Sequence, residues 1–135
     1  MATRGVYRFK EMGKAGVIHK VYNHWDNYPS NAYILIKNTL RLAWPLPRFE
    51  ADEFACAFIA ANKDQAGGMR LMPHDQEDMG QDYNYLISFE LNEGATGFYP
   101  DGKLIISFDD YNNSGKITFR GTLEEMEKYI KDKDE

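Results

Sequence analysis

The sequence is poor in several features that would define its compartment or its chemistry. It holds one cysteine, Cys56, so no disulfide can form within the chain and no cysteine-based zinc site exists. No apolar run approaches the ~20 residues of a membrane-spanning helix, and the first residues lack the apolar stretch of a secretory signal. We therefore expect a cytoplasmic protein without a membrane segment.

Basic residues are also scarce, because 16 lysines and arginines face 21 aspartates and glutamates and leave a net charge of −5. Phosphate contacts need clustered lysine and arginine, so direct nucleic-acid binding is not expected. The sequence contains no G-x-S-x-G turn, no glycine-rich phosphate loop and no H-E-x-x-H metal motif. We accordingly predict no cofactor, and the sequence favours a protein that is not an enzyme.

The chain does have enough apolar and aromatic sequence for a folded core. Hydrophobic residues make up 43% and aromatic residues 14% of its 135 positions, which fits a single α+β domain over residues 1–135. Strict alternation of apolar and polar side chains predicts a strand over residues 83–91. Weaker strand patterns lie at residues 6–10, 17–25, 69–72, 103–109 and 116–120.

Helical patterns separate these predicted strands into two groups along the chain. Pro29 begins a predicted helix whose apolar residues recur as far as Trp44, and a second helix carries a stripe that includes Phe54 and ends at Gly67-Gly68. Thr122-Leu-Glu-Glu125 is a capping box that starts a C-terminal helix. The predicted order is ββααβββ(β)α: a mainly antiparallel sheet of five to six strands, with two central helices and one C-terminal helix.

The most unusual stretch is His24-Trp25-Asp26-Asn27-Tyr28-Pro29-Ser30, where a predicted strand meets a predicted helix. Strand alternation places His24 and Asp26 on the same face as Tyr22. Histidine and carboxylate ligands suit Zn, Mn or Fe, and a histidine held by a carboxylate transfers protons near neutral pH. Segment 73–82 is polar and acidic, and we expect it to be a mobile loop. Its His74, Asp75 and Asp78 would complete a metal site or an acid–base pair.

The same stretch also has a purely structural interpretation. His24 and Asp26 would then bond to backbone groups at the junction, with Asp26 capping the following helix. Trp25 and Tyr28 would pack in the core, and Cys56 would be a buried thiol and not a nucleophile paired with His24. Because no fixed ligand spacing is present, the sequence favours this structural interpretation.

Other residues are candidates for binding. Arg4 would pair with Asp26 or bind an anion. Four tyrosines would either form an exposed aromatic surface for a partner or pack in the sheet in the ordinary way; they are Tyr83, Tyr85, Tyr99 and Tyr111. Asp109 and Asp110 would add to a negative patch, which is a solvated face or a mimic of nucleic acid for a basic partner.

Several of these residues together resemble a family of small uncharacterised phage and prophage proteins. The resemblance spans about residues 2–90 and rests on Ala2-Thr3-Arg4, the His24–Ser30 block, the helix at 54–62, Gly68-Met-Arg-Leu71 and Asp82-Tyr-Asn-Tyr85. The family usually has glycine where this chain has Asn27, and asparagine tolerates the left-handed conformation that such a turn requires. The resemblance implies no activity, only an accessory gene of a phage or mobile element.

From size, acidity and this resemblance we expect a binding protein that inhibits or modulates a host or defence protein. The predicted binding residues are Arg4, Tyr22, His24, Trp25, Asp26, Tyr28, His74, Asp75 and Asp78. One alternative is a metal-dependent hydrolase or nuclease that uses His24, Asp26 and His74 or Asp78. Another is a protein that sequesters a nucleotide signal between aromatic side chains and Arg4. The sequence leaves open the identity of the partner and whether the protein forms a homodimer.

Overall fold

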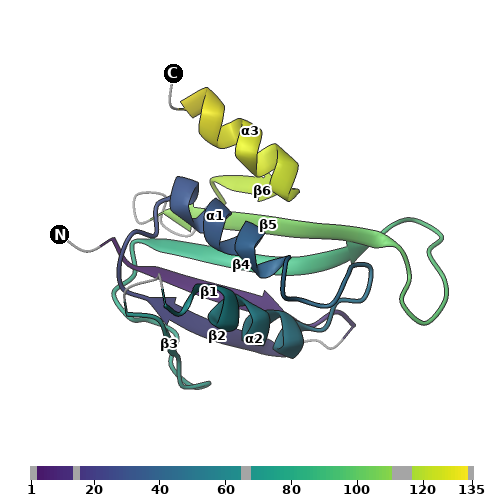
Figure 1. The fold of residues 1–135 in the computed structure, drawn as a ribbon, viewed down its shortest axis with the longest axis horizontal. Coiled ribbons are helices and arrows are strands. Elements are labelled where there is room, and N and C mark those ends of the chain that lie inside the picture. The colour runs from purple at the N-terminus through teal and green to yellow at the C-terminus, as the bar shows by residue number, and fades with distance from the viewer. Residues whose placement is uncertain (1–2, 14–15, 65–67, 111–116, 134–135) are drawn as a thin grey trace.

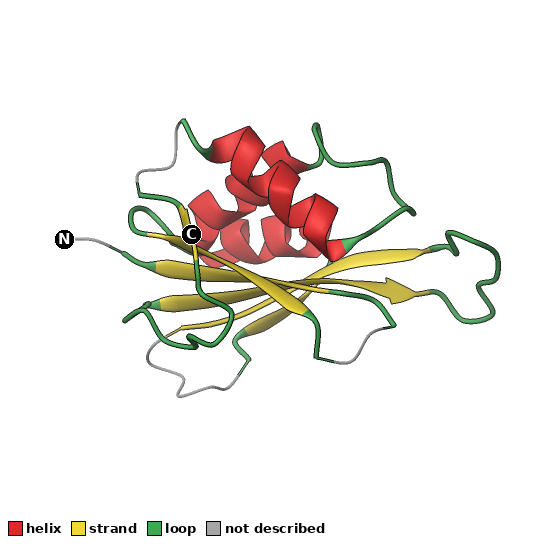
Figure 2. Ribbon diagram, turned by 90° about the horizontal axis from the view of Figure 1, so that it is seen from below, coloured by secondary structure: helices red, strands yellow, loops and turns green. Residues whose placement is uncertain are grey.

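A computed structural model describes residues 3–13, 16–64, 68–110 and 117–133, in which six strands form one sheet (Figure 1). The strands are β1 (Gly5–Lys10), β2 (Ile18–Asn23), β3 (Arg70–Leu71), β4 (Tyr83–Leu91), β5 (Gly102–Asp110) and β6 (Phe119–Gly121). The helices are α1 (Pro29–Thr39), α2 (Ala51–Asn62) and α3 (Leu123–Lys133). Figure 2 shows the helices on one face of the sheet.

The α+β class and the predicted order of elements are confirmed, but the sheet is mixed. Its strand order is β3-β2-β1-β4-β5-β6, in which β1 and β4 are parallel and the other neighbouring pairs are antiparallel. After the β1–β2 hairpin, the chain passes through two helices and β3 before β4 pairs with the free side of β1. Apolar alternation identifies strands but not their neighbours, so this parallel pair had no signal in the sequence.

The main core lies between the sheet and the helices. Tyr7 and Phe9 of β1 and Tyr85 of β4 point to this side and are buried, and they meet Phe54 and Phe58 of α2. The predicted apolar stripe of α2 is therefore confirmed. Each fully buried aromatic side chain contributes roughly 2 kcal/mol by leaving water.

A smaller cluster lies on the opposite face of the sheet. Val6, Tyr22 and Met72 are buried there, and Met79 from the 73–82 segment packs against them. The segment therefore covers the part of this face that β1 and β2 form. In the part of the chain that the structure describes, no helix is both long and apolar enough to cross a bilayer.

Several predicted boundaries need correction. α1 ends at Thr39, although apolar residues continue at helical spacing to Trp44, and Leu40 and Trp44 are exposed. Trp44 precedes a proline, which disfavours helical backbone at that position. The capping box is confirmed, because the backbone N–H of Thr122 donates to Glu125 Oε1 at 2.9 Å and that of Glu125 to Thr122 Oγ1 at 3.2 Å. Gly67, Tyr111 and residues 112–115, which separate the strands predicted at 103–109 and 116–120, lie outside the described residues.

Candidate functional site

Residues 24–28 form a sharp corner between β2, which ends at Asn23, and α1, which begins at Pro29; we call them the 24–28 corner. The left-handed residue of this corner is Asp26, with a φ of 59°, and not Asn27 as the resemblance suggested. Aspartate and asparagine both tolerate this conformation better than most residues. Asn27 is instead the buried residue of the corner.

The side chain of Asn27 joins three parts of the chain by hydrogen bonds. Its Oδ1 accepts from the Tyr7 hydroxyl at 2.7 Å and from Asn23 Nδ2 at 3.0 Å. Its Nδ2 donates to the carbonyls of Thr3, Asn23 and Trp25 at 2.9, 2.8 and 3.0 Å. Because buried amides are stable only when their polar atoms are paired, this network holds the corner in one conformation.

The backbone of Asn27 is fixed as well. Its N–H donates to the carbonyl of Thr3 at 3.1 Å, and its carbonyl accepts from the Tyr85 hydroxyl at 2.6 Å. Burial raises the pKa of the Tyr7 and Tyr85 hydroxyls, so both remain protonated donors at neutral pH. A side chain at Gly5 would put its Cβ 2.7 Å from Asn27 Cβ, so this close packing requires glycine.

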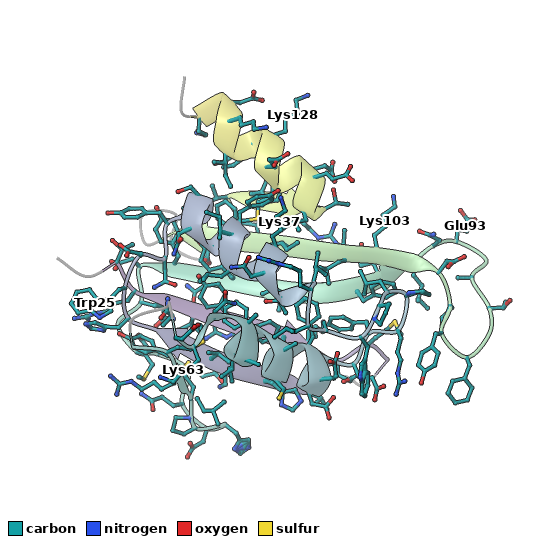
Figure 3. The ribbon with its side chains drawn as sticks, in the orientation of Figure 1. Trp25, Lys37, Lys63, Glu93, Lys103 and Lys128 are labelled. Carbon is teal, nitrogen blue, oxygen red and sulfur yellow. The ribbon has the colours of Figure 1, made fainter. Side chains whose placement is uncertain are left out.

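The buried network leaves the aromatic residues of the corner on the surface. Trp25 is 47% exposed and Tyr28 is 54% exposed, so the prediction that they pack in the core is wrong. Figure 3 shows Trp25 at the opposite end of the molecule from Glu93. Asp26 is also exposed and does not cap α1; its carbonyl accepts from Asn31 Nδ2 at 2.6 Å.

His24 supports the corner from the side of the sheet. Its Nδ1 lies 2.6 Å from the Tyr22 hydroxyl, and its ring meets Trp25 edge-on at 4.5 Å between centroids. A Cβ on Gly68 would lie 2.8 Å from His24 Cβ, which shows how closely the neighbouring backbone approaches. Tyr22, one of the predicted binding residues, is buried and contributes to this support instead of to the surface.

Arg4 connects the corner to the end of the 73–82 segment. Its backbone N–H donates to Asp82 Oδ2 at 2.9 Å, and its carbonyl accepts from the Asp82 N–H at 2.9 Å. Among the described residues, no ion pair joins Arg4 to Asp26, so that predicted pair is wrong. The corner and the last residues of the segment therefore flank the same stretch of chain.

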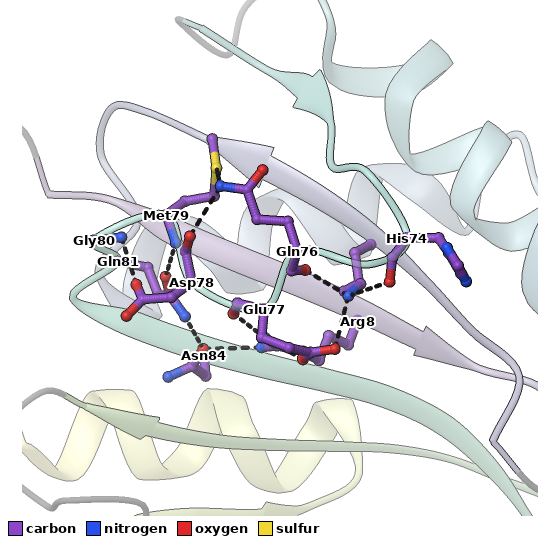
Figure 4. Close-up of polar contacts among 10 residues, drawn as sticks. Arg8, His74, Gln76, Glu77, Asp78, Met79, Gly80, Gln81 and Asn84 are labelled. Atoms are coloured by element: carbon purple, nitrogen blue, oxygen red, sulfur yellow. Dashed lines mark hydrogen bonds and ion pairs between the residues drawn. The ribbon is translucent and has the colours of Figure 1, made fainter.

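The 73–82 segment is fastened to the sheet, whereas its polar composition had predicted a mobile loop. Lys20 Nζ donates to the carbonyls of His74 and Gln76 at 3.1 and 2.6 Å and lies 3.0 Å from Glu77 Oε1. Arg8 donates to the Glu77 carbonyl and to Asn84 Oδ1, both at 2.9 Å (Figure 4). The hydrogen bond from Lys20 lowers the pKa of Glu77, which therefore remains charged in this contact at neutral pH.

The residues proposed for a metal or acid–base site do not converge. Lys20, which holds His74, precedes His24 by four positions, about 13 Å along an extended strand. His74 instead lines a pocket of about 430 Å³ between β2 and α2, together with His19 and Cys56. Within the described residues, no group of three or more His, Cys, Asp or Glu side chains is placed to hold a metal ion.

Cys56 and His19 line this pocket together, which the sequence did not indicate. Cys56 was predicted to be buried but is exposed, because it lies on the side of α2 that faces away from the core. His19 and Cys56 line the same pocket because β2 and α2 pack together. No sequence spacing indicates that two such distant segments share a pocket.

The remaining candidates divide between core and surface. Tyr85 is buried and Tyr83 half-buried, so sheet packing accounts for both, while Tyr99 is exposed. Asp75 and Asp78 are exposed, as a binding role would require, and Asp78 Oδ1 accepts from the Gly80 N–H at 2.7 Å. Asp109 is half-buried, and the side chain of Asp110 lies outside the described residues.

No protein-family model matches the chain, and no curated protein or solved structure matches it either. The function therefore has to be inferred from the 24–28 corner and its surroundings.

Proposed function

We propose that this protein acts by binding another protein, with the 24–28 corner at the centre of its binding surface. The supporting observation is that Trp25 and Tyr28 are exposed on backbone that the buried Asn27 network holds rigid. Tryptophan and tyrosine are among the residues that contribute most to protein interfaces. A fixed backbone also reduces the entropy lost when the side chains are ordered on binding.

The acidic character of the chain favours a basic partner. Asp26 lies between the two exposed aromatic residues, and Asp75 and Asp78 are exposed on the 73–82 segment. The whole chain carries a net charge of −5. Complementary charge accelerates encounter and excludes acidic surfaces, so the partner should present an apolar pocket with lysine or arginine at its rim.

The resemblance of the His24–Ser30 block to phage and prophage proteins supports a host or defence protein as the partner. Binding at the corner would then inhibit or modulate that protein. This activity uses recognition alone and requires no cofactor in the chain.

The test is capture of a partner from a host lysate with matched variants of the corner. Trp25→Ala combined with Tyr28→Ala removes the two exposed rings and leaves Asn27 in place, so the fold should persist. We expect the double variant to retain at most about a tenth of the captured partner, since interface aromatic residues often contribute 2 kcal/mol or more. Ile34→Ala, at a half-exposed position of α1, is the control and should capture as much as the original chain.

Two results would contradict the proposal. One is equal capture by the double variant and the control. The other is a stoichiometric metal or small molecule in native mass spectrometry and elemental analysis of the purified protein, which would favour the hydrolase, nuclease or ligand-sequestering alternatives. The same native mass would report whether the protein forms a homodimer.

A further inference from the structure

A groove runs along the outer surface of α2, on the side away from the sheet. It consists of two adjoining hollows of about 460 and 560 Å³, which share Leu42 and Ala60. Its far wall is the 41–44 part of the connection between α1 and α2, and its floor is α2 itself. No residue of the 24–28 corner lines it, so it is a separate feature of the molecule.

The wall of this groove is held in place although its side chains are exposed. The backbone N–H of Trp44 lies 3.1 and 3.2 Å from the two carboxylate oxygens of Glu53, in the first turn of α2. The guanidinium of Arg48 lies 3.7 Å from the centroid of the Trp44 ring. Leu42 is nevertheless 56% exposed. A fixed wall with exposed apolar side chains is typical of a preformed binding groove.

The two ends of the groove carry net charges of opposite sign. Glu50, Asp52 and Glu53 line it at the start of α2. Arg41, Lys63 and Asp64 line it at the end, where Figure 3 labels Lys63, and there the two cations outnumber the one carboxylate. From Asp52 to Lys63 the helix rises about 17 Å, the length of about three helical turns. A helix that lay in the groove would therefore meet apolar contacts at its middle and opposite charges at its two ends.

We propose that this groove is a second protein-binding site, and that its occupant is an amphipathic helix of a partner protein. The apolar face of that helix would lie between Leu42 and Ala60, which is the helix-in-groove mode of recognition. Its basic end would lie over Asp52 and Glu53, and its acidic end over Arg41 and Lys63. The chain would then bind one partner at the 24–28 corner and another along α2.

Cys56 offers a direct probe of this site, because it is the only cysteine in the chain, is exposed and lines the groove. The ligand for the test is a synthetic helical peptide of about 14 residues, roughly 21 Å long. It has a leucine face, lysines in one half of its polar face and glutamates in the other. A peptide concentration ten times its Kd should slow alkylation of Cys56 by N-ethylmaleimide by about tenfold.

Two variants distinguish the groove from general adhesion of the peptide. Ala60→Gln fills the middle of the groove at an exposed helical position and should abolish the protection. Ile34→Gln changes an exposed position of α1 outside the groove and should leave the protection intact. Each variant is compared with itself, with and without the peptide, so that a change in the intrinsic rate of alkylation does not matter.

Other results would overturn the proposal. These are the absence of protection, protection that survives Ala60→Gln, and equal protection by a peptide with glutamine in place of its charged residues. Concentration-dependent protection of Cys56 without any peptide, together with a dimer in sedimentation velocity, would also overturn it, because the occupant would then be a second copy of the chain.

Discussion

Replacing Asn27 with alanine should destabilise the fold more than its size suggests. The substitution removes the side-chain contacts that join Asn27 to Thr3, Tyr7, Asn23 and Trp25, in which the two protons of Nδ2 are shared among three carbonyls. At a net value of about 1 kcal/mol for each accepted or donated proton these contacts would sum to ~4 kcal/mol, but water can reach some of the abandoned carbonyls. The Tyr7 hydroxyl is fully buried and would lose its acceptor. We expect a net loss of about 4 kcal/mol in the free energy of unfolding.

The measurement is urea unfolding of the original chain and the variant, followed by circular dichroism and by tryptophan fluorescence. A loss of this size would be a large part of the 5–15 kcal/mol that is typical of a whole domain. Asn92→Ala is the matched control, because Asn92 is exposed and should change stability by less than about 0.5 kcal/mol. A loss below about 1 kcal/mol for Asn27→Ala would refute the idea that this network holds the corner.

Three further predictions concern the titration of Tyr7 and Tyr85, the contacts of Lys20 with the 73–82 segment and the close packing at Gly5. Because burial raises the pKa of Tyr7 and Tyr85, both stay protonated in the fold while unfolded tyrosines ionise near pH 10.0, so the free energy of unfolding should fall above that pH. For two groups the slope is about 2.7 kcal/mol per pH unit, and equal urea midpoints at pH 9 and 11 would contradict it. Lys20→Met should accelerate amide hydrogen exchange in the 73–82 segment, with unchanged exchange as the contrary result. Gly5→Ala should reduce the free energy of unfolding by about 2 kcal/mol, and unaltered stability would show that the corner can move aside.

Local patterns predicted much of the fold, because the forces that produce those patterns act between near neighbours in the sequence. The alternation over 83–91 became β4, and the capping box at Thr122 began α3. The parallel pairing of β1 with β4 depends on how the chain returns after α2, and no local pattern records that path. The apolar periodicity that continued to Trp44 was misleading because Pro45 disfavours helical backbone at Trp44 and a hydrogen bond to Glu53 of α2 holds that segment outside the helix.

The candidate site shows the same division between what is local and what is not. The unusual composition of the block predicted a junction between a strand and a helix, but the structural interpretation of the block placed Trp25 and Tyr28 in the core. Both are exposed, as the predicted binding role requires, and Asn27, a polar residue whose burial was not predicted, is buried. Asparagine can be buried here because Thr3, Tyr7 and Tyr85, which come from distant parts of the sequence, supply partners in addition to its neighbours Asn23 and Trp25. The side-chain chemistry of a single block cannot reveal partners that only the folded chain brings together.

The fastening of the 73–82 segment has a consequence for how its surface can evolve. Two of the three groups that Lys20 contacts are backbone carbonyls, those of His74 and Gln76, and every amino acid provides such a carbonyl. Substitutions at the exposed positions 74 and 75 can therefore alter the shape and charge of the segment while its path over the sheet stays the same. A lineage under pressure from a changing partner could then replace the outward side chains one by one without rebuilding the scaffold beneath them.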